Sequence, residues 1–398
     1  MADKHHLLSR GKLGCAFHRL ASVPGTERLP LLRHYFGRAL KGLHAHQLAA
    51  KKSSQLAHYL RRAYPQARSL SIQDFAAINS GWENEVYSFT LNEGPFGSRA
   101  REELILRIYP GYNALERANK EIQALEGLHR VGYPVPRVFL HDAGETSPFG
   151  LPFLLMERIQ GRPLADELYH SSSGEKEELI ELFCSLLARL HEVNWRAIVP
   201  EPERFEPAGQ GSIIEQSFAE SRSRVESLLL PGFWPTWDWL FRHQGDIGST
   251  HLVLAHLDYH PGNLLLKEHV ETLGESAVVI DWTCSEVTDF RFDLAYTLMI
   301  IGSFHQWELR DKVLREYERQ TGKIVAEMDY FDAIARFLRL LVILSSLTLG
   351  PGAAGMRPGS EQMIRGQASA VRRMYEHLVR ITGLTIPEVE IFLETKKA

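Results

Sequence analysis

The chain has 398 residues, of which 44% are hydrophobic and 24% are charged, and its formal net charge is -4. This composition is typical of a globular protein long enough for two packed lobes, and it excludes an intrinsically disordered chain. The three cysteines, Cys15, Cys184 and Cys284, are far apart and form no CxxC pair. We therefore expect neither a disulfide framework nor a cysteine zinc site.

The first part of the chain is strongly basic. Residues 1–70 contain 13 Lys and Arg but only two acidic residues, Asp3 and Glu27. We interpret residues 1–52 as a basic N-terminal extension, which either binds an anionic partner such as nucleic acid or a membrane, or lies against the acidic remainder of the chain. We favour the second alternative and expect no nucleic-acid partner. A transit peptide, typically rich in Arg and poor in acidic residues, is a third alternative.

Two observations favour a cytoplasmic protein. The longest uncharged stretch, 340–356, is interrupted by Gly350-Pro351-Gly352, so its apolar part is well short of the ~20 residues of a membrane-spanning helix. The residues after Met1 contain no apolar core of a secretory signal. We expect no membrane partner, and the sequence leaves the oligomeric state open.

A β-rich lobe with a leading helix is predicted over 53–157. Leu56, Tyr59, Leu60 and Ala63 recur at helical spacing, which predicts a helix over 53–64. From about residue 71 the pattern changes to short runs rich in β-branched and aromatic residues, separated by turn residues. The further elements expected in this lobe are strands at 86–91, 103–109, 137–140 and 153–157 and a helix at 114–130.

The rest of the chain, 158–398, is predicted to form a larger, mainly helical lobe. Apolar residues recur there at helical spacing in several segments. The helices expected are 176–193, 212–229, 306–320, 329–348 and 361–382. The runs 263–267 and 277–280 predict one β-hairpin among these helices.

Carboxylates and an amide gather within residues 256–282. Asp258 is followed five residues later by Asn263, which is the spacing of a kinase catalytic loop, where the Asp accepts the substrate proton and the Asn holds a metal ion. Asp281 ends an apolar run and is a second candidate metal ligand. Mg²⁺ prefers oxygen donors and keeps several waters, so one carboxylate, one amide oxygen and the phosphates of ATP suffice.

In these motifs the chain resembles the aminoglycoside phosphotransferase and choline kinase family, whose signature is H-x-D-x-x-x-x-N followed by a strand ending in I-D-W or I-D-F. The resemblance implies that Asp258 is the catalytic base, that Asn263 and Asp281 bind the metal, and that His256 braces the loop. Asp293, in a segment similar to D-P-x-x-D-L-A, is implied to support the catalytic loop from the start of a helix. The implied fold is α+β and bilobal, the protein kinase-like fold, with ATP and Mg²⁺ between a small β-rich N-lobe and a larger, mainly helical C-lobe.

The same resemblance extends to residues expected to bind the nucleotide. Ser80, Gly81 and Asn84 lie in a segment similar to the short loop that covers the phosphates. Arg107 stands where kinases have a lysine; it can bind phosphate, although its rigid fork is not equivalent to lysine. Glu121 is expected to pair with Arg107, and its alternative is a solvated charge on the helix surface.

The segment around the end of the strand 153–157 resembles the hinge between the lobes. Met156, Glu157 and Ile159 are its candidate nucleotide-binding residues, and the backbone there is implied to bond the adenine. Together the motifs predict an ATP- and Mg²⁺-dependent phosphotransferase that acts on a hydroxyl group of a small molecule. The acceptor is an aminoglycoside-like antibiotic, an amino alcohol, a sugar or a related metabolite.

Three other functions are compatible with parts of the pattern. His256, Asp258 and His260 alternate along the chain and could bind zinc in a metallohydrolase. A protein kinase shares the spacing of the catalytic loop, but the Gly-rich loop, D-F-G and A-P-E are absent from the sequence. A catalytically silent ATP-binding protein of the same fold is the third alternative.

The acceptor does not follow from these motifs. A polycationic aminoglycoside requires acidic pocket walls, for which Glu201, Asp238 and Glu286 are candidates. The aromatic segment 233–239 either forms a wall for an apolar or sugar-like substrate or packs in the core.

Overall fold

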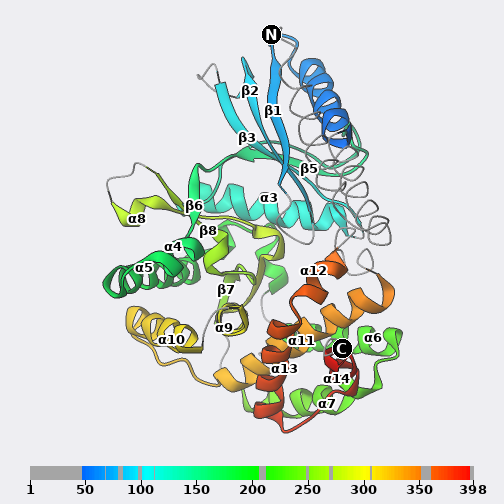
Figure 1. Cartoon of the computed structure of the whole chain (residues 1–398), viewed down its shortest axis with the longest axis vertical. Coiled ribbons are helices and arrows are strands. Elements are labelled where there is room, and N and C mark those ends of the chain that lie inside the picture. The colour runs from blue at the N-terminus through cyan, green and yellow to red at the C-terminus, as the bar shows by residue number, and fades with distance from the viewer. Residues whose placement is uncertain are drawn as a thin grey trace, which may run out of the picture. The chain divides into compact units, whose positions relative to one another are not determined.

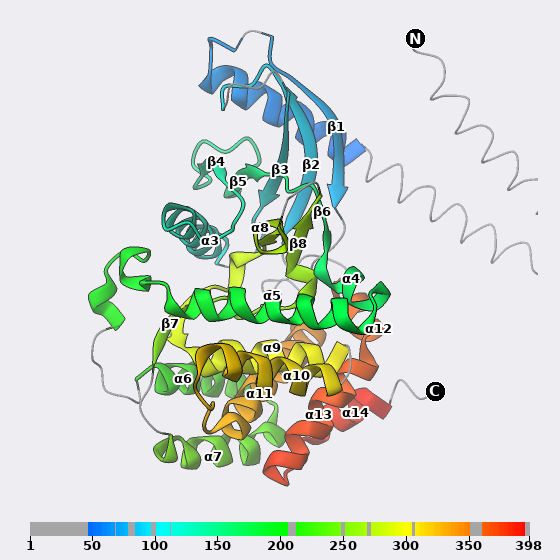
Figure 2. The same cartoon turned by 90° about the vertical axis from the view of Figure 1, so that its left-hand side faces the viewer.

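The computed structural model (Figures 1 and 2) divides into two compact units, Met1–Ala63 and Tyr64–Ala398. It describes residues 47–67, 69–78, 84–96, 101–111, 113–205, 212–247, 251–268, 272–304, 307–350 and 360–394. In the first unit a helix runs through residues 47–63, which confirms the helix predicted from residue 53. Most of the predicted basic extension lies outside the described residues.

The second unit begins with a five-stranded antiparallel sheet in the order β1-β2-β3-β5-β4. Its strands are β1 (Ser71–Ile78), β2 (Glu85–Asn92), β3 (Arg101–Ile108), β4 (Val138–Asp142) and β5 (Phe153–Glu157). The central strands β2, β3 and β5 are largely buried, as expected for runs rich in Leu, Ile and aromatic residues. The strands predicted from the sequence are confirmed.

Helix α3 (Ala114–Arg130) follows the sheet and packs against β4 and β5. Its buried side chains include Ala118, Ile122, Leu125 and Leu128, the helical stripe that predicts it. The same helix also contacts the 3₁₀ turn Trp282–Cys284 of the helical lobe. A single helix therefore links the sheet to the segment that carries Asp281.

Short strands in the helical lobe hold the catalytic loop. Strand β7 (Leu252–Ala255) pairs with β10 (Glu286–Asp289). A separate three-stranded sheet has the order β6-β8-β9, with β6 (Gly161–Pro163), β8 (Leu264–Lys267), the short helix α8 (Leu273–Ser276) and β9 (Ala277–Val279). Residues 256–263 join β7 to β8, so these two strands fix both ends of the loop. The predicted hairpin is β8-β9.

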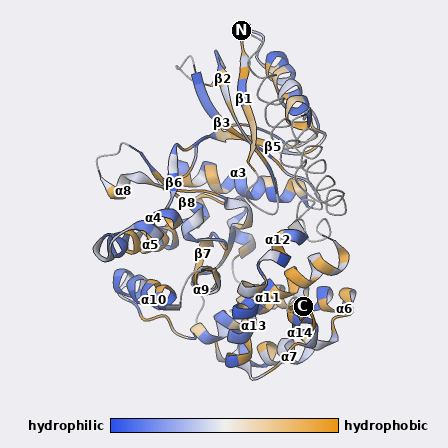
Figure 3. Ribbon diagram, in the orientation of Figure 1, coloured by the Kyte–Doolittle hydropathy of each residue, from blue (hydrophilic) through white to orange (hydrophobic). Residues whose placement is uncertain are grey.

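The remainder of the unit is helical, and its helices form layers: α5 contacts α10, α10 contacts α9, and α9 contacts α11 and α13 (Figure 2). The helices are α4 (Leu164–His170), α5 (Ser173–Glu192), α6 (Ser212–Leu228), α7 (Trp234–His243), α9 (Phe290–Phe304), α10 (Trp307–Thr321), α11 (Met328–Leu349), α12 (Ser360–Gly366), α13 (Ala368–Thr382) and α14 (Pro387–Glu394). Figure 3 shows α10 as mainly hydrophilic, in agreement with its two buried residues, Val313 and Tyr317.

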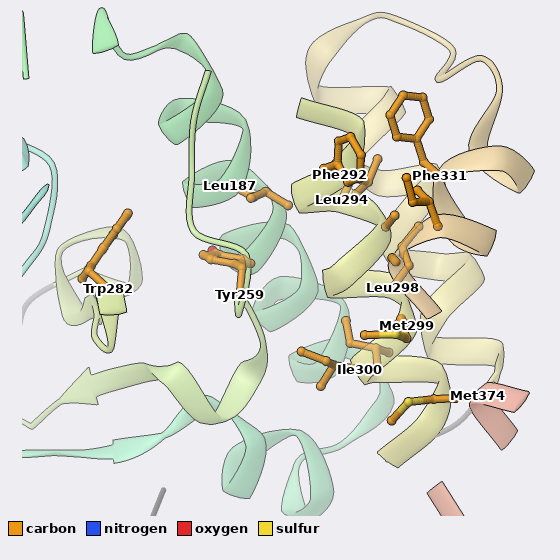
Figure 4. Close-up of a cluster of buried hydrophobic side chains, with 14 of the residues drawn as sticks. Leu187, Tyr259, Trp282, Phe292, Leu294, Leu298, Met299, Ile300, Phe331 and Met374 are labelled. Atoms are coloured by element: carbon orange, nitrogen blue, oxygen red, sulfur yellow. The ribbon is translucent and has the colours of Figure 1, made fainter. Parts of the chain in front are cut away.

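The helix start that the resemblance implies at Asp293 is confirmed by α9, although the periodicity of the sequence did not predict this helix. It is hydrophobic on nearly all sides, and most of its residues are buried, so no polar face reveals a helical period. Figure 4 shows its side chains Phe292 and Leu294 close to Phe331 of α11, and the rings of Phe292 and Phe331 are 5.2 Å apart. This helix is the centre of the helical lobe.

One predicted helix was wrong in extent. The segment 361–382 forms two helices, α12 and α13, with a break at Gln367, whose φ and ψ are -103° and 21°. Gly366 precedes the break and has a low helix propensity, which explains why the pattern is interrupted there. Within the described residues, no helix is long and apolar enough to cross a membrane.

Candidate active site

The turn before Asp258 is held by a buried carboxylate. Asp293, in the first turn of α9, accepts hydrogen bonds from the backbone amides of His256 (2.8 Å) and Leu257 (2.7 Å). Leu257 has a φ of 58°, a conformation that costs a non-glycine residue free energy and persists only where its surroundings fix it. Asp293 also lies 3.2 Å from Nε2 of His191. Burial raises its pKa, but the hydrogen bonds and charges of His191 and His256 together outweigh that effect and leave the pKa lowered.

Asp258 and Asn263 are in direct contact. Nδ2 of Asn263 donates to the backbone carbonyl of Asp258 (3.0 Å) and to Oδ2 of its carboxylate (3.3 Å). Because both bonds use the amide nitrogen, Oδ1 of Asn263 is available as a metal ligand. The backbone amide of Ile280 donates to the Asn263 carbonyl (2.9 Å), so the end of the second strand of the hairpin is tied to the same loop.

Both ring nitrogens of His256 contact backbone groups in or next to the catalytic loop. Its Nε2 lies 3.0 Å from the carbonyl of Ile280, and its Nδ1 accepts from the amide of Asp258 (3.2 Å). A ring used in this way braces the loop and has no nitrogen left for zinc. His260 likewise accepts from the amide of Gly262 through Nδ1. Among the described side chains, no three His, Cys, Asp or Glu are grouped to hold a metal. The zinc hypothesis therefore has no support.

Tyr259 anchors the loop to helix α5. Its hydroxyl donates to the carbonyl of Phe183 (2.8 Å), and the two rings are 4.6 Å apart. Figure 4 shows Tyr259 reaching towards the helix that carries Leu187. The side chain of Tyr259 is thus fully buried, whereas Asp258 lines the cavity.

Asp281 shares Arg107 with Glu121. Nη1 of Arg107 donates to Oδ1 of Asp281 (2.7 Å) and to Oε1 of Glu121 (2.7 Å). Glu121 is only 1% exposed, so it is paired as predicted and is not a solvated helix charge. Tyr109 donates to its second carboxylate oxygen (2.7 Å). Burial raises the pKa of Asp281, but the charge and hydrogen bond of Arg107, together with His256 and Thr283, outweigh burial and leave the pKa lowered, so the carboxylate is ionised. Like Leu257, Asp281 has a positive φ, 68°.

Thr283 is a residue of this network that the sequence did not reveal. Its Oγ1 lies 3.1 Å from both Glu121 and Asp281 and accepts from Arg107 (3.0 Å). It also accepts from Nδ2 of Asn84 (3.2 Å), which joins the residue just before β2 to the network. The one feature of the sequence that could have indicated this role is its position two residues after Asp281. Ser80 and Gly81 lie outside the described residues.

The predicted hinge residues lie at the end of β5. The amide of Glu157 donates to the carbonyl of Arg137 (2.9 Å), and the amide of Arg158 donates to that of Glu103 (3.1 Å). Met156, Glu157 and Ile159 all line the cavity described next. The amides of Glu157 and Arg158 are therefore already bonded within the protein.

One cavity of about 650 Å³ brings the predicted residues together. Asn84, Arg107, Asp258, Asn263 and Asp281 line it, together with the three hinge residues, whereas His256, Glu121 and Asp293 support the lining residues from behind. The other lining residues come from the sheet, from the β6-β8-β9 region and from the helical lobe. The residues lining it are Ile78, Asn84, Val86, Ile105, Arg107, Pro136, Met156, Glu157, Arg158, Ile159, Ala165, Asp258, His260, Gly262, Asn263, Leu265, Ile280, Asp281, Cys284, Ile300, Phe304, Arg339 and Gln367.

The cavity shifts the pKa of Asp258 towards neutrality. Burial raises it to about 6 from its ordinary 3.8, against the lowering effect of Arg339, and the charge of Asp281 adds to the rise. A carboxylate with such a pKa is ionised at pH 7 and is basic enough to accept a proton. Burial lowers the pKa of His260 to about 4, so this neighbour is neutral at the same pH.

The candidates for an acidic acceptor wall lie elsewhere. Glu201, Asp238 and Glu286 are not among the described residues that line the cavity, and Glu286 pairs with Lys120 instead (2.8 Å). The aromatic segment 233–239 belongs to the core, since Phe233 and Trp237 are buried and Trp234 and Trp239 pack against the core. The sequence alternative in which these rings form a substrate wall was therefore wrong.

The protein belongs to the Phosphotransferase enzyme family, whose sequence model matches residues 74–341. This is the aminoglycoside phosphotransferase and choline kinase group that the sequence resembles, and the chain is an enzyme of this phosphotransferase family. Between Asp281 and α9 the chain forms only the 3₁₀ turn Trp282–Cys284 and strand β10, with no room for the activation segment of a protein kinase.

Solved structures share the fold, and curated relatives share part of the sequence. Aminoglycoside 2'-phosphotransferase-IIIa in complex with GDP is 16% identical with a TM-score of 0.53, covering 82% of this chain and 98% of that one. Choline kinase LicA from Streptococcus pneumoniae is 16% identical with a TM-score of 0.50, covering 82% and 99%. These likenesses confirm the α+β kinase-like fold.

Acyl-CoA dehydrogenase family member 11 from Pongo abelii is 26% identical over 196 residues, 48% of this chain and 24% of that protein. The chain spans about a quarter or less of the length of the curated relatives that it matches.

Proposed function

We propose that the protein transfers the γ-phosphoryl group of ATP to a hydroxyl group of a small molecule, with Mg²⁺ as the metal ion. The observation that carries this proposal is that Asp258, Asn263 and Asp281 line one cavity, with Asn263 bonded to Asp258. These are the parts that phosphoryl transfer requires: a group that orients the attacking hydroxyl and oxygen ligands for the metal. Membership of a phosphotransferase family supports the same reaction.

The residues present suit Mg²⁺. Asp281 is ionised because Arg107 lowers its pKa, and the amide oxygen of Asn263 is not used by the bonds that its nitrogen makes. Hard oxygen donors of this kind are the ligands that Mg²⁺ prefers. Asn263 and Asp281 would hold the ion, which neutralises charge on the phosphate oxygens when it is bound.

Asp258 supplies the proton chemistry. Its carboxylate accepts the proton of the acceptor hydroxyl while the hydroxyl oxygen forms a bond to the γ-phosphorus. The bond from that phosphorus to the bridging oxygen of ADP breaks, and ADP leaves with the electron pair. Asp293 and His256 keep the carboxylate in position through the backbone of the loop, so they act as positioning residues.

The N-lobe residues hold the nucleotide. The hinge backbone around Ile159 bonds the base, and Arg107 lies beside the phosphates, oriented by Glu121 and Thr283. Asn84 lines the same cavity and would contact the nucleotide there. Backbone and guanidinium donors of this type stabilise phosphate charge without taking part in covalent chemistry.

An Asp258→Asn variant tests the proposal. ADP release is measured against a panel of hydroxylated metabolites and antibiotics, with ATP binding measured separately by calorimetry. We expect wild type to release ADP in an acceptor-dependent way, and the variant to bind ATP normally but to turn over ~10²- to 10⁴-fold more slowly. Near-normal turnover by the variant contradicts the role of Asp258. ATP binding without transfer by wild type, on any acceptor, identifies a silent ATP-binding protein instead.

A further inference from the structure

The far end of the cavity, on the side of the helical lobe, has a distinct lining. We call it the acceptor end and define it as Cys284, Ile300, Phe304, Arg339 and Gln367, all of which line the cavity. Ile300 and Phe304 come from α9, Arg339 from α11, and Gln367 from the break before α13. The sheet and the hinge line the other end, so the catalytic loop lies between a nucleotide end and this acceptor end.

Reaction geometry assigns the acceptor end to the molecule that receives the phosphoryl group. In an in-line transfer the attacking hydroxyl and the departing ADP lie on opposite sides of the phosphorus. If the sheet and hinge hold ATP, the acceptor must approach Asp258 from the side of α9 and α11. Arg339 is close enough to Asp258 that its charge lowers the pKa of that carboxyl against the effect of burial.

The charge at the acceptor end is positive. Arg339 is its one charged residue among the described lining residues. The remaining carboxylates of the lining are Asp258 and Asp281, which have roles in catalysis and metal binding, and Glu157, which belongs to β5 at the hinge. A cationic acceptor would meet repulsion here, whereas an anionic one would be attracted.

Gln367 provides a second, independent sign of a polar ligand. Its side-chain oxygen Oε1 is buried and has no hydrogen-bond partner within the described part of the chain. A buried acceptor atom without a partner is costly, so such atoms commonly meet a ligand or a water. A donor on the acceptor molecule, such as a second hydroxyl group, would satisfy it. Ile300 and Phe304, which line the same cavity, provide an apolar wall for a short carbon chain.

We infer that the acceptor is an anionic alcohol, a small hydroxylated molecule that carries a carboxylate or phosphate group. Arg339 binds this anionic group, and Oε1 of Gln367 accepts a hydrogen bond from a second hydroxyl group. Arg is suited to this because its planar guanidinium binds a carboxylate or phosphate through two parallel hydrogen bonds. The inference rests on the proposed phosphotransferase function and specifies its substrate class. It distinguishes this protein from kinases of amino alcohols and aminoglycosides, whose acceptors are cations.

Matched acceptors test the charge preference. One set has three carbons: glycerate, glycerol 3-phosphate, neutral glycerol and cationic serinol. A second set has six carbons: gluconate, glucose and glucosamine. Acceptor-dependent ADP release gives kcat and KM for each compound, and thermal stabilisation in the presence of a non-hydrolysable ATP analogue gives binding without turnover. We expect the anionic members to exceed their neutral and cationic counterparts by ~10- to 100-fold in kcat/KM, the effect of one charge-assisted contact. A comparison of kcat/KM for glycerate and glycerol 3-phosphate shows whether a carboxylate or a phosphate group is preferred.

Variants of Arg339 assign the preference to this residue. Arg339→Gln should raise KM for the anionic acceptors by a similar factor and leave kcat little changed, while Arg339→Glu should shift the preference towards serinol and glucosamine. Arg315→Glu is the matched control, because Arg315 is an exposed residue of α10 that is not part of the cavity lining. The control should keep the preference of wild type.

The outcomes separate the two proposals. Preference of wild type for serinol or glucosamine overturns the inference and leaves the phosphotransferase function standing. An equal fall in kcat for all acceptors in Arg339→Gln also overturns it, since Arg339 would then act on the transferred phosphoryl group. Stabilisation by the anionic compounds without any transfer contradicts the function but supports the anionic site. Absence of both transfer and charge-dependent stabilisation contradicts both.

Discussion

The catalytic loop and the acceptor end are held in different ways. The functional residues of the loop lie close together in sequence, and buried hydrogen bonds to more distant segments hold them: Asp293 accepts from two backbone amides before Asp258. His256 and Tyr259 contact the backbone carbonyls of Ile280 and Phe183. The acceptor end is assembled from residues of separate helices, brought together only by packing. The chemistry of the reaction is thus encoded in a short motif, whereas the choice of acceptor is encoded in the arrangement of α9, α11 and α13.

The largest expected difference between the two regions is in stability. Asp293→Ala removes a buried carboxylate that pairs with His191 and with two backbone amides. We expect a loss of ~3–5 kcal/mol in the free energy of unfolding, because breaking a buried pair leaves its partners unsatisfied. Gln367→Ala at the acceptor end should change it by less than ~1 kcal/mol, since Oε1 has no described partner to lose. Urea denaturation measures both. Equal effects would contradict the comparison.

The pH dependence of the rate is the next largest effect. The pKa of Asp258 is raised to about 6, so the base is increasingly protonated below that pH. We expect kcat/KM to fall roughly tenfold per pH unit below 6, hence ~100-fold by pH 4. Between pH 7 and 8 Asp258 is ionised, so its titration should leave kcat/KM unchanged there. An acid limb with its midpoint near the ordinary carboxyl pKa would show that the pKa of Asp258 is not raised.

The same shift has a consequence for stability. A carboxyl whose pKa is higher in the folded state binds its proton more tightly there, so stability falls as the pH rises from about 4 through about 6. Asp258→Asn removes this cost and should be more stable than wild type by ~1–3 kcal/mol at pH 7.5, with the difference vanishing near pH 4. Thermal unfolding at several pH values measures it. A variant that is less stable than wild type at pH 7.5 would show that the charge is not destabilising.

The smallest effect concerns the anchor on α5. Tyr259→Phe keeps the ring contact with Phe183 but loses the hydrogen bond to its carbonyl. We expect ~1 kcal/mol of destabilisation and a modest fall in kcat with KM for ATP unchanged. Tyr169→Phe is the control, because Tyr169 is 61% exposed. Indistinguishable behaviour of the two variants would mean that Tyr259 does not position the loop.

Much of the fold and of the catalytic centre is predictable from the sequence for a physical reason. The β-runs around Val86 and Leu104 and the stripe of α3 follow the periods of strands and helices, and Asp258 and Asn263 are close in the chain as well as in space. Thr283 was missed because its role depends on meeting Glu121 and Arg107, which are remote in sequence.

The acceptor end was not predictable in the same way. Arg339 stands in a long helix among apolar residues, and nothing local indicates that it reaches a cavity with Asp258. Helix α9 has no polar face to mark it, and Gln367 matters only because α12 and α13 break there. Glu286, one of the acidic candidates from the sequence, pairs with Lys120 instead.

Manganese binding tests the central claim most directly, because Mn²⁺ accepts the same oxygen ligands as Mg²⁺ and its binding is followed by electron paramagnetic resonance without any turnover. In the presence of a non-hydrolysable ATP analogue, wild type and Asp258→Asn should bind the ion tightly, while Asn263→Ala and Asp281→Asn should bind it at least ~10-fold more weakly. Wild-type affinity in both of these last variants would contradict the assignment of Asn263 and Asp281 as the metal ligands, and with it the proposed reaction.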